Sequence, residues 1–256
     1  MPSWIDVSSP DIAGSAAFYC GLFGWEVSPD QGEQFGGYRI FSKDGAPVAG
    51  IGPVSGGPPA WTTYMNVTDA DATAARIAPA GGTLAVPPMD LPDGNGRISF
   101  GVDPAGGFFG LFQAGPNHFG AALVNEVGTL VWNELNVRDP QSVLPFYESV
   151  FGWTTAPMTG DGPSDYHLIS VDGRVVAGVM TMGEGFPEHV PTHWLPYLVV
   201  ADAQASADRC EALGGGVVMP PFPTGMGPMA VLRDPDGAVF AIGALEQIDD
   251  PNSWPS

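Results

Sequence analysis

The residues best suited to chemistry lie in two short segments of the same design. Trp4 and Asp6 alternate near the start of the sequence, and Trp132 and Glu134 alternate in the same way 128 residues later. In an extended strand, alternate side chains share one face, so each tryptophan lies beside a carboxylate. A carboxylate that faces a cavity is costly unless it is paired, and burial raises its pKa. Asp6 and Glu134 are therefore the candidate catalytic acid–base groups.

The same alternation predicts which other side chains face a cavity. In the segment 61–67, Thr62 and Tyr64 share a face, and Tyr197 takes the corresponding place in the segment 194–200. Aromatic walls with a few polar groups suit a flat organic ligand. The predicted ligand-binding residues are Trp4, Thr62, Tyr64, Trp132, Asn136, His193 and Tyr197.

Histidines and cysteines offer little else that is suited to catalysis or metal binding. His193 directly precedes the segment 194–200, and with an inward-facing Glu134 it forms the one acid–base or displaced metal pair that the sequence suggests. The other histidines are expected in solvated connections (His118, His189) or packed in a strand (His167). The two cysteines form no CxxC or Cys/His cluster, which argues against a zinc knuckle or a redox pair.

These residues belong to an internal duplication with a constant offset of 128 residues. The matching segments are FYCGLFGW (18–25) with FYESVFGW (146–153), and YRIFS (38–42) with YHLIS (166–170). Further along, the offset drifts by a few residues, and DPAGG (103–107) matches DPDGA (234–238). A repeat of this length indicates two copies of one structural unit.

Each copy contains a weaker second symmetry of a strand, a helix and three short strands. Ser9 is the expected N-cap of the first helix, with Pro10 at the first helical position and Gly24 at its end. Asp69 is the expected cap of the second helix. The sequence therefore predicts an α+β fold of four βαβββ modules. The predicted divisions are a first domain (1–118), a linker (119–129), a second domain (130–247) and a tail (248–256).

These motifs resemble the vicinal oxygen chelate superfamily, which includes glyoxalase I, bleomycin resistance proteins and extradiol dioxygenases. The resemblance covers nearly the whole chain twice, and is strongest to two-domain actinobacterial glyoxalase-like or "hydroxylase" proteins. It implies two tandem, partly closed barrels, each built from two modules around a cavity.

In metal-dependent members of that superfamily, four strand positions supply His, Gln or Glu ligands to one divalent ion. The resemblance places these positions at Trp4, Gly50 or Gly52, Thr62 and Gly110, and at Trp132, Gly178 or Met180, Leu195 and Ala241. None of these residues is a good metal ligand. We therefore expect no metal and no other cofactor.

Composition excludes several classes of partner. The chain of 256 residues carries 28 acidic and 8 basic residues, a formal net charge of −20. Such a surface repels the phosphates of nucleic acids. No apolar stretch approaches the ~20 residues that span a bilayer, and no signal segment is apparent. We expect a cytoplasmic protein whose partner is a small molecule, with monomer and homodimer both open.

The leading hypothesis is metal-independent binding of a small, aromatic metabolite or antibiotic in a Trp/Tyr-lined cavity. One alternative is an enzyme, either glyoxalase- or dioxygenase-like, or an acid–base isomerase, cyclase or lyase. The other alternative is a degenerate protein with an interaction role, in which Trp and Tyr fill a core and the carboxylates bond to their neighbours.

Overall fold

The computed structural model describes residues 1–29, 36–118, 120–159 and 165–245, so the predicted tail lies outside the described residues. The strands of the first half are β1 (Pro2–Ser9), β2 (Glu26–Val27), β3 (Arg39–Lys43), β4 (Ala46–Pro53), β5 (Ala60–Asn66), β6 (Thr83–Asp90), β7 (Gly96–Val102) and β8 (Phe108–Ala114). Those of the second half are β9 (Leu130–Val137), β10 (Thr154–Pro157), β11 (Tyr166–Val171), β12 (Arg174–Thr181), β13 (His193–Val199), β14 (Gly216–Phe222), β15 (Met229–Arg233) and β16 (Val239–Gly243). The α-helices are α1 (Ile12–Phe23), α2 (Ala70–Ile77), α3 (Leu144–Phe151) and α4 (Ala203–Ala212), and the 3₁₀ turns are η2 (Pro92–Gly94) and η3 (Pro140–Ser142).

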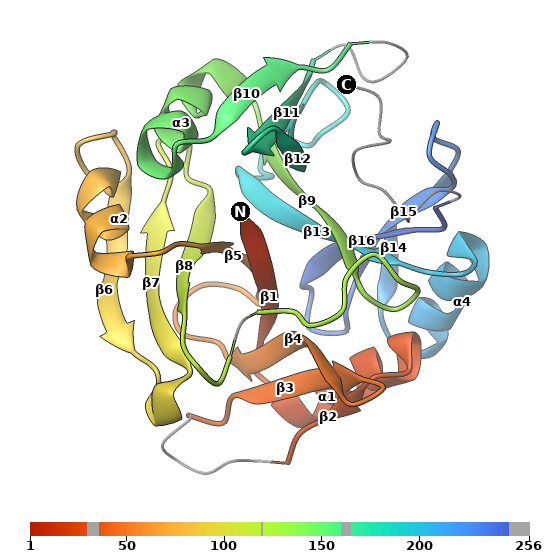
Figure 1. Cartoon of the computed structure of the whole chain (residues 1–256). Helices are drawn as coiled ribbons and strands as arrows, with labels where there is room; N and C mark the ends of the chain where they lie inside the picture. The colour runs from red at the N-terminus through yellow and green to blue at the C-terminus, as the bar shows by residue number, and fades with distance from the viewer. Residues whose placement is uncertain (30–35, 119, 160–164, 246–256) are drawn as a thin grey trace.

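Each half of the chain builds one open eight-stranded sheet (Figure 1). The order is β2-β3-β4-β1-β5-β8-β7-β6 in the first sheet and β10-β11-β12-β9-β13-β16-β15-β14 in the second. In the first half, the opening strand β1 pairs parallel with β4 and antiparallel with β5. In the second half, β9 pairs in the same way with β12 and β13. The predicted α+β fold of four βαβββ modules in two partly closed barrels is confirmed. We call the concave faces the first cup (with Trp4, Asp6 and Tyr64) and the second cup (with Trp132, Glu134 and Tyr197).

The start of α1 differs from the sequence prediction. The N-cap is Asp11, whose carboxylate accepts a hydrogen bond from the backbone N–H of Gly14 at 3.0 Å. The sequence predicts Ser9 in this role. Ser9 instead ends β1, and its hydroxyl accepts a hydrogen bond from the backbone N–H of Asp11 at 2.9 Å. Pro10 therefore lies before the helix. The predicted end is confirmed, because Gly24 adopts a left-handed conformation (φ 71°) that favours glycine.

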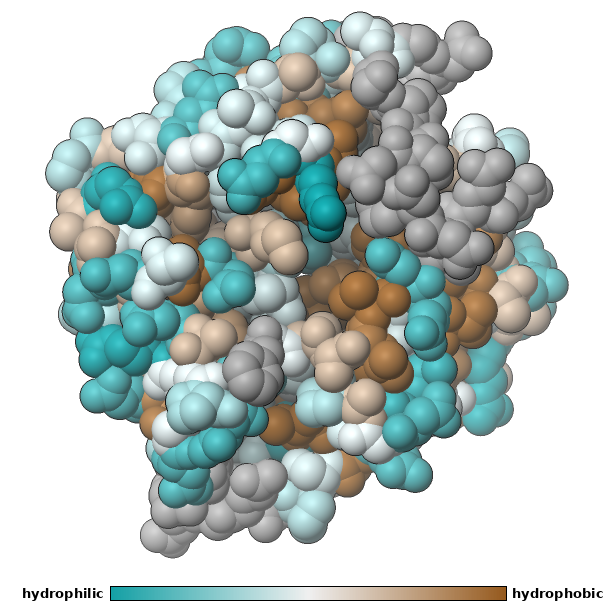
Figure 2. Space-filling view, viewed as in Figure 1, coloured by the Kyte–Doolittle hydropathy of each residue, from teal (hydrophilic) through white to brown (hydrophobic). Residues whose placement is uncertain are grey.

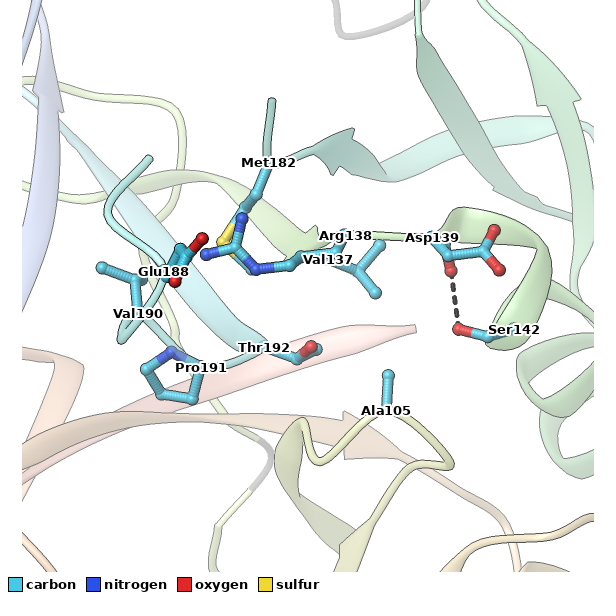
Figure 3. Close-up of a pocket in the computed structure, with 10 residues that line it drawn as sticks. All are labelled: Ala105, Val137, Arg138, Asp139, Ser142, Met182, Glu188, Val190, Pro191 and Thr192. Atoms are coloured by element: carbon cyan, nitrogen blue, oxygen red, sulfur yellow. Dashed lines mark hydrogen bonds between the residues drawn. The ribbon is translucent and has the colours of Figure 1, made fainter. Parts of the chain in front are cut away.

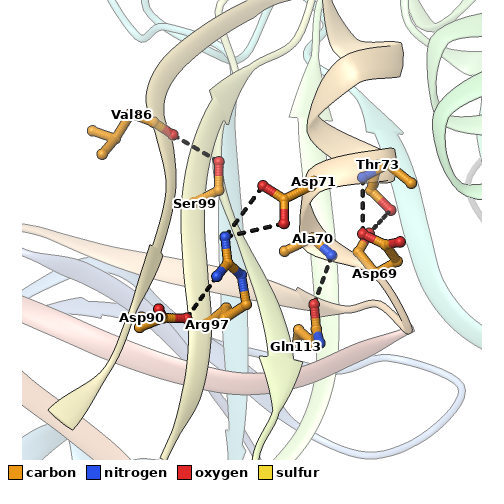
Figure 4. A network of polar contacts seen from close by, with 10 residues as sticks. Asp69, Ala70, Asp71, Thr73, Val86, Asp90, Arg97, Ser99 and Gln113 are labelled. Carbon is orange, nitrogen blue, oxygen red and sulfur yellow. Dashed lines mark hydrogen bonds and ion pairs between the residues drawn. The ribbon is translucent and has the colours of Figure 1, made fainter.

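The second helix begins where the sequence predicts. The Asp69 carboxylate accepts the backbone N–H of Ala72 at 2.9 Å and so caps α2. Arg97 of β7 forms ion pairs with Asp71 on this helix and with Asp90 at the edge of the sheet (Figure 4). Both carboxylates are exposed, so these pairs contribute little to stability.

The two main hydrophobic cores lie between the halves rather than inside each one. One core joins α1 and its strands to α4 and β16, and the other joins α2 and β8 to α3 and β9. Figure 1 shows α1 beside α4, and α2 beside α3, around the outside of the sheets. One face of each sheet packs against the helices, and the side chains on the opposite face form the cups.

The aspartate of each DPxG turn binds a tyrosine from the other half. Tyr19 donates to Asp234 at 2.9 Å, and Tyr147 donates to Asp103 at the same distance. Tyr19 and Tyr147 are the tyrosines of the two FYxxxFGW motifs. Each motif therefore forms a hydrogen bond between the two halves of the chain. The aspartates have structural roles.

The face of the molecule drawn in Figure 2 carries both hydrophilic and hydrophobic side chains. Hydrophilic side chains cover most of the face in Figure 2, with apolar side chains gathered near its centre. Among the described residues, no helix is long and apolar enough to cross a membrane.

Candidate functional site

The first cup contains a closed hydrogen-bond network around one carboxylate. Tyr64 and Tyr38 both donate to Oδ2 of Asp6, at 2.7 and 3.2 Å, and the indole N–H of Trp4 donates to the Tyr38 hydroxyl at 2.9 Å. Asp6 is only 8% exposed. Alternation along β1 places these groups together, because Ile5 and Val7 face the core while Trp4 and Asp6 face the cup.

The second cup repeats the network with a longer carboxylate. Tyr166 and Tyr197 donate to the two carboxylate oxygens of Glu134, each at 2.9 Å, and the Trp132 indole donates to the Tyr166 hydroxyl at 2.9 Å. Glu134 is 5% exposed. The structure thus places a tryptophan, a carboxylate and a tyrosine of the predicted set in the same arrangement in each cup.

Burial dominates the titration of both carboxylates. It raises the pKa of Asp6 from the usual value of 3.8 to about 6, although the hydrogen bonds from Tyr64 and Tyr38 oppose the rise. Burial also raises the pKa of Glu134, against the hydrogen bonds from Tyr197 and Tyr166 and the nearby Asn136 amide. A raised pKa leaves each group able to hold or release a proton closer to neutral pH.

Sequence reasoning missed the two tyrosines that complete the networks. Tyr38 and Tyr166 lie at the same place in the duplicated segments YRIFS and YHLIS, but the alternation of these segments was not considered. Glycines that face the two tyrosine hydroxyls are a second signal. A Cβ at Gly50 would collide with the Tyr38 hydroxyl, and one at Gly178 would collide with the Tyr166 hydroxyl.

The residues at the family's metal-ligand positions do not fit a metal. In the first cup, Gly50 faces the Tyr38 hydroxyl, and Gly110 faces the ring of Tyr64, which fills the space of a longer side chain. The oxygen atoms at the centre of the first cup belong to the Asp6 carboxylate and to the hydroxyls of Tyr64 and Tyr38. Both hydroxyls already donate hydrogen bonds to the carboxylate. Among the described residues, no group of three or more His, Cys, Asp or Glu side chains is placed to hold a metal ion. A divalent ion needs three or four converging N or O ligands.

The structure does not join His193 to Glu134. Glu134 is opposite Leu195 in the ladder between β9 and β13, whereas His193 is opposite Asn136. The Nδ1 atom of His193 lies 2.8 Å from the carbonyl oxygen of Pro191. Thr62, the remaining predicted residue, lies opposite Asp6 and is 9% exposed.

The segment after β8 packs over the tryptophan of the first cup. The His118 ring lies edge-on to Trp4 with a centroid distance of 4.7 Å, and 5.1 Å from the Phe112 ring. The prediction that His118 is solvated was wrong, since this packing buries it in part and lowers its pKa. The N–H of Ala121 bonds to the Ser3 carbonyl at 2.8 Å and holds the segment in place.

Among the described residues, two pockets lie outside the cups. One has a volume of about 360 Å³ and is bordered by Arg138, Glu188 and Thr192 (Figure 3). The Arg138 guanidinium donates to the carbonyl of Pro187 at 2.8 Å. The other, of about 320 Å³, lies between the ends of α1 and α4. Neither contains the carboxylate–tyrosine arrangement of the cups.

Comparison with curated proteins finds relatives of nearly the full length. The chain is 39% identical over 249 residues to the putative glyoxylase CFP32 of Mycobacterium bovis, covering 94% of this chain and 93% of the relative. It is 34% identical over 262 residues to the anthracycline biosynthesis protein DauV of Streptomyces sp. (strain C5), covering 96% and 94%.

Solved structures share the fold. The Mn(II)-bound glyoxalase from Novosphingobium aromaticivorans matches with a TM-score of 0.64 at 16% identity, covering 97% of this chain and 83% of that one. The 2,3-dioxygenase LapB from Pseudomonas sp. KL28 matches with a TM-score of 0.64 at 17% identity, covering 100% and 95%. The family model described as Glyoxalase/Bleomycin resistance protein/Dioxygenase superfamily matches residues 2–109 and 124–242. The chain is therefore a member of the glyoxalase/bleomycin resistance protein/dioxygenase superfamily, with two copies of its domain.

Proposed function

We propose that the chain binds a small, flat aromatic molecule in the second cup without a metal ion. The observation that carries the proposal is the apolar wall around Trp132 and Tyr166. Met158, Met180 and Tyr197 pack against these rings and remain partly exposed. Flat aromatic faces beside flexible methionines form surfaces that adapt to apolar ligands.

The electrostatics of the cup favour a neutral ligand over a cation. The single carboxylate, Glu134, already accepts two hydrogen bonds, and burial raises its pKa. A metal-dependent glyoxalase or dioxygenase reaction would need ligands that the family positions do not supply. The relatives named for anthracycline biosynthesis fit the proposal, because anthracyclines are polycyclic aromatic compounds.

Calorimetric titration with a panel of polycyclic aromatic compounds tests the proposal. At least one compound should bind with a stoichiometry of one, and Met180→Gln should weaken its binding several-fold by placing an amide in the apolar wall. Met219→Gln is the matched control, since Met219 lies on β14 at the edge of the sheet and is 42% exposed. The absence of saturable binding across the panel would contradict the proposal.

A second candidate function is acid–base catalysis on the bound molecule. The observation that favours it is the raised pKa of Glu134, whose carboxylate lies between two tyrosine hydroxyls. Such a group transfers a proton in isomerisation, cyclisation or elimination. In this case Glu134→Gln abolishes turnover while ligand affinity changes little. If Glu134→Gln retains full turnover of an identified substrate, Glu134 is not the acid–base group.

The expected partner class and compartment follow the same proposal. The partner is a small molecule, and the net charge of −20 disfavours nucleic acid. The cytoplasm stays the predicted location.

A further inference from the structure

The second cup holds a polar pair that the first cup lacks. Asn136 of β9 and His193 of β13 are directly opposite in the antiparallel ladder. Asn136 shares the face of Glu134, and His193 shares the face of Tyr197, so both belong to the cup face. The corresponding places in the first cup hold Ser8 and Ala60, which are opposite each other in the ladder between β1 and β5.

Asn136 carries an unsatisfied hydrogen-bond donor. The residue is 2% exposed, and its Nδ2 atom is buried without a hydrogen-bond partner. The amide interacts with the Glu134 carboxylate strongly enough to lower the pKa of that carboxyl, but Nδ2 has no partner at normal hydrogen-bond distance and angle. A buried amide without a partner is costly, so its retention needs a reason.

His193 supplies the complementary acceptor. Its Nδ1 atom lies 2.8 Å from the Pro191 carbonyl oxygen, which can only accept, so Nδ1 carries the proton. Burial lowers the pKa of His193 and keeps the imidazole neutral. The Nε2 atom is therefore a hydrogen-bond acceptor, and the side chain is partly exposed.

In the first cup the same place is already satisfied. The Ser8 hydroxyl donates to the Ala60 carbonyl at 3.3 Å and accepts the Ala60 N–H at 3.2 Å. Nothing at these two positions is left to recognise a ligand. The second cup thus has a hydrogen-bond donor, Asn136, opposite an acceptor, His193, whereas the first cup has Ser8 and Ala60 at these places.

We propose that Asn136 and His193 together recognise a hydroxyl group on the aromatic ligand of the second cup, an inference that rests on the proposed function. The hydroxyl donates its proton to Nε2 of His193. After a small rotation of the amide, it accepts a hydrogen bond from Nδ2 of Asn136. The ligand class is therefore aromatic compounds with a free hydroxyl, and a methyl ether lacks the proton that His193 accepts.

The test compares a monohydroxyanthraquinone with its methyl ether by calorimetric titration. The wild-type chain should bind the hydroxyl compound about tenfold more tightly, as expected for one additional hydrogen bond. His193→Ala and Asn136→Leu should each reduce this preference to about twofold or less. Ser8→Ala is the matched control in the first cup and should keep the full preference.

A second measurement needs no substitution. In nitrogen NMR of the wild-type chain, the Nε2 resonance of His193 should shift on addition of the hydroxyl compound and stay in place with the ether. An unchanged Nε2 resonance with the bound hydroxyl compound would overturn the inference, as would equal affinity of the two compounds for the wild type. The inference would also be overturned if the preference for the hydroxyl compound stays in both His193→Ala and Asn136→Leu, or if Ser8→Ala loses it. Failure of both compounds and of the whole aromatic panel to bind would instead contradict the proposed function.

Discussion

Asp6 and Glu134 share one set of partners in the two cups. Each carboxylate accepts two tyrosine hydroxyls, and each is linked through one of them to a tryptophan indole. Burial raises both pKa values despite these bonds. At residue scale, hydrogen bonding only partly offsets the cost of excluding water from each carboxylate, so burial shifts both carboxyls toward the protonated form relative to water.

This burial predicts how stability depends on pH. A folded pKa of about 6 for Asp6, above its usual 3.8, means that the folded state binds the proton more tightly. The contribution is present in full below pH 3.8 and is lost as pH rises through about 6, with a total of about 3 kcal/mol. Asp6→Asn removes the titrating group and keeps an acceptor for both tyrosines.

Urea denaturation of wild type and Asp6→Asn at pH 5 and pH 8 measures the effect. We expect the free energy of unfolding of the wild type to fall by about 1 kcal/mol more than that of the variant between these pH values. Glu184→Gln, at an exposed position, is the control and should follow the wild type. Equal pH dependence in wild type and Asp6→Asn would show that Asp6 titrates normally.

Alternation along the opening strands predicted that Trp4, Asp6 and Tyr64 share a face, because Ile5 and Val7 are apolar and pack in the core. The structure brings these three side chains together, with Tyr64 donating to Asp6 and packing with Trp4. Other features depend on contacts between segments distant in the sequence. His118 reaches Trp4 only because the segment after β8 returns across the first cup, which no local pattern encodes.

At the scale of elements, glycines in β4 and β12 make room for the tyrosines. Gly50 and Gly178 lie beside the opening strands, next to Asp6 and Glu134 respectively. Gly50 faces the hydroxyl of Tyr38, the residue before β3, and Gly178 faces the hydroxyl of Tyr166, the first residue of β11. The strands thus place an aromatic hydroxyl beside Gly50 and Gly178, which are among the candidate positions for metal ligands that the resemblance to the superfamily implies.

Gly178→Ala tests this arrangement. The new methyl group collides with Tyr166 and should lower the free energy of unfolding by about 1–3 kcal/mol, the usual cost of overpacking. Gly183→Ala is the matched control, since no atom lies within 4 Å of its added Cβ. Chemical denaturation of both variants measures the difference. If Gly178→Ala is as stable as Gly183→Ala, the tyrosine does not occupy the space beside the glycine.

The order of elements was predictable, whereas their ends were less so. Asp69 was correctly identified as a cap, and it directly precedes Ala70, the first residue of α2. At α1, Ser9 and Asp11 are both capping residues two positions apart, and only the geometry of the turn decides between them. The domain boundaries at 118 and 130 stay a prediction.

At the scale of the molecule, the two halves are joined by buried polar contacts as well as by shared cores. The Tyr147 hydroxyl donates to Asp103 and accepts the Trp194 indole N–H, both at 2.9 Å. Tyr19 makes the same contacts with Asp234 and Trp61, at 2.9 and 3.0 Å. Because the cores cross between the halves, we expect the chain to unfold in one cooperative transition.

Tyr147→Phe tests the connection between the halves. It leaves the Asp103 carboxylate and the Trp194 indole each short of a buried partner, which should cost about 1–3 kcal/mol of unfolding free energy per group. Thr154→Val, which removes an exposed hydroxyl, is the control and should change stability by less than about 0.5 kcal/mol. Calorimetry should show one transition at a lower midpoint for Tyr147→Phe. A midpoint unchanged from wild type would contradict this role.

The central claim is that the second cup binds its aromatic ligand without a metal ion. The most direct measurement is calorimetric titration of the monohydroxyanthraquinone into chain dialysed against a chelator, repeated after addition of Mn²⁺ or Zn²⁺. We predict saturable binding with the same affinity in all samples. Binding that appears only in a metal-loaded sample, with one bound ion per chain, would contradict the claim.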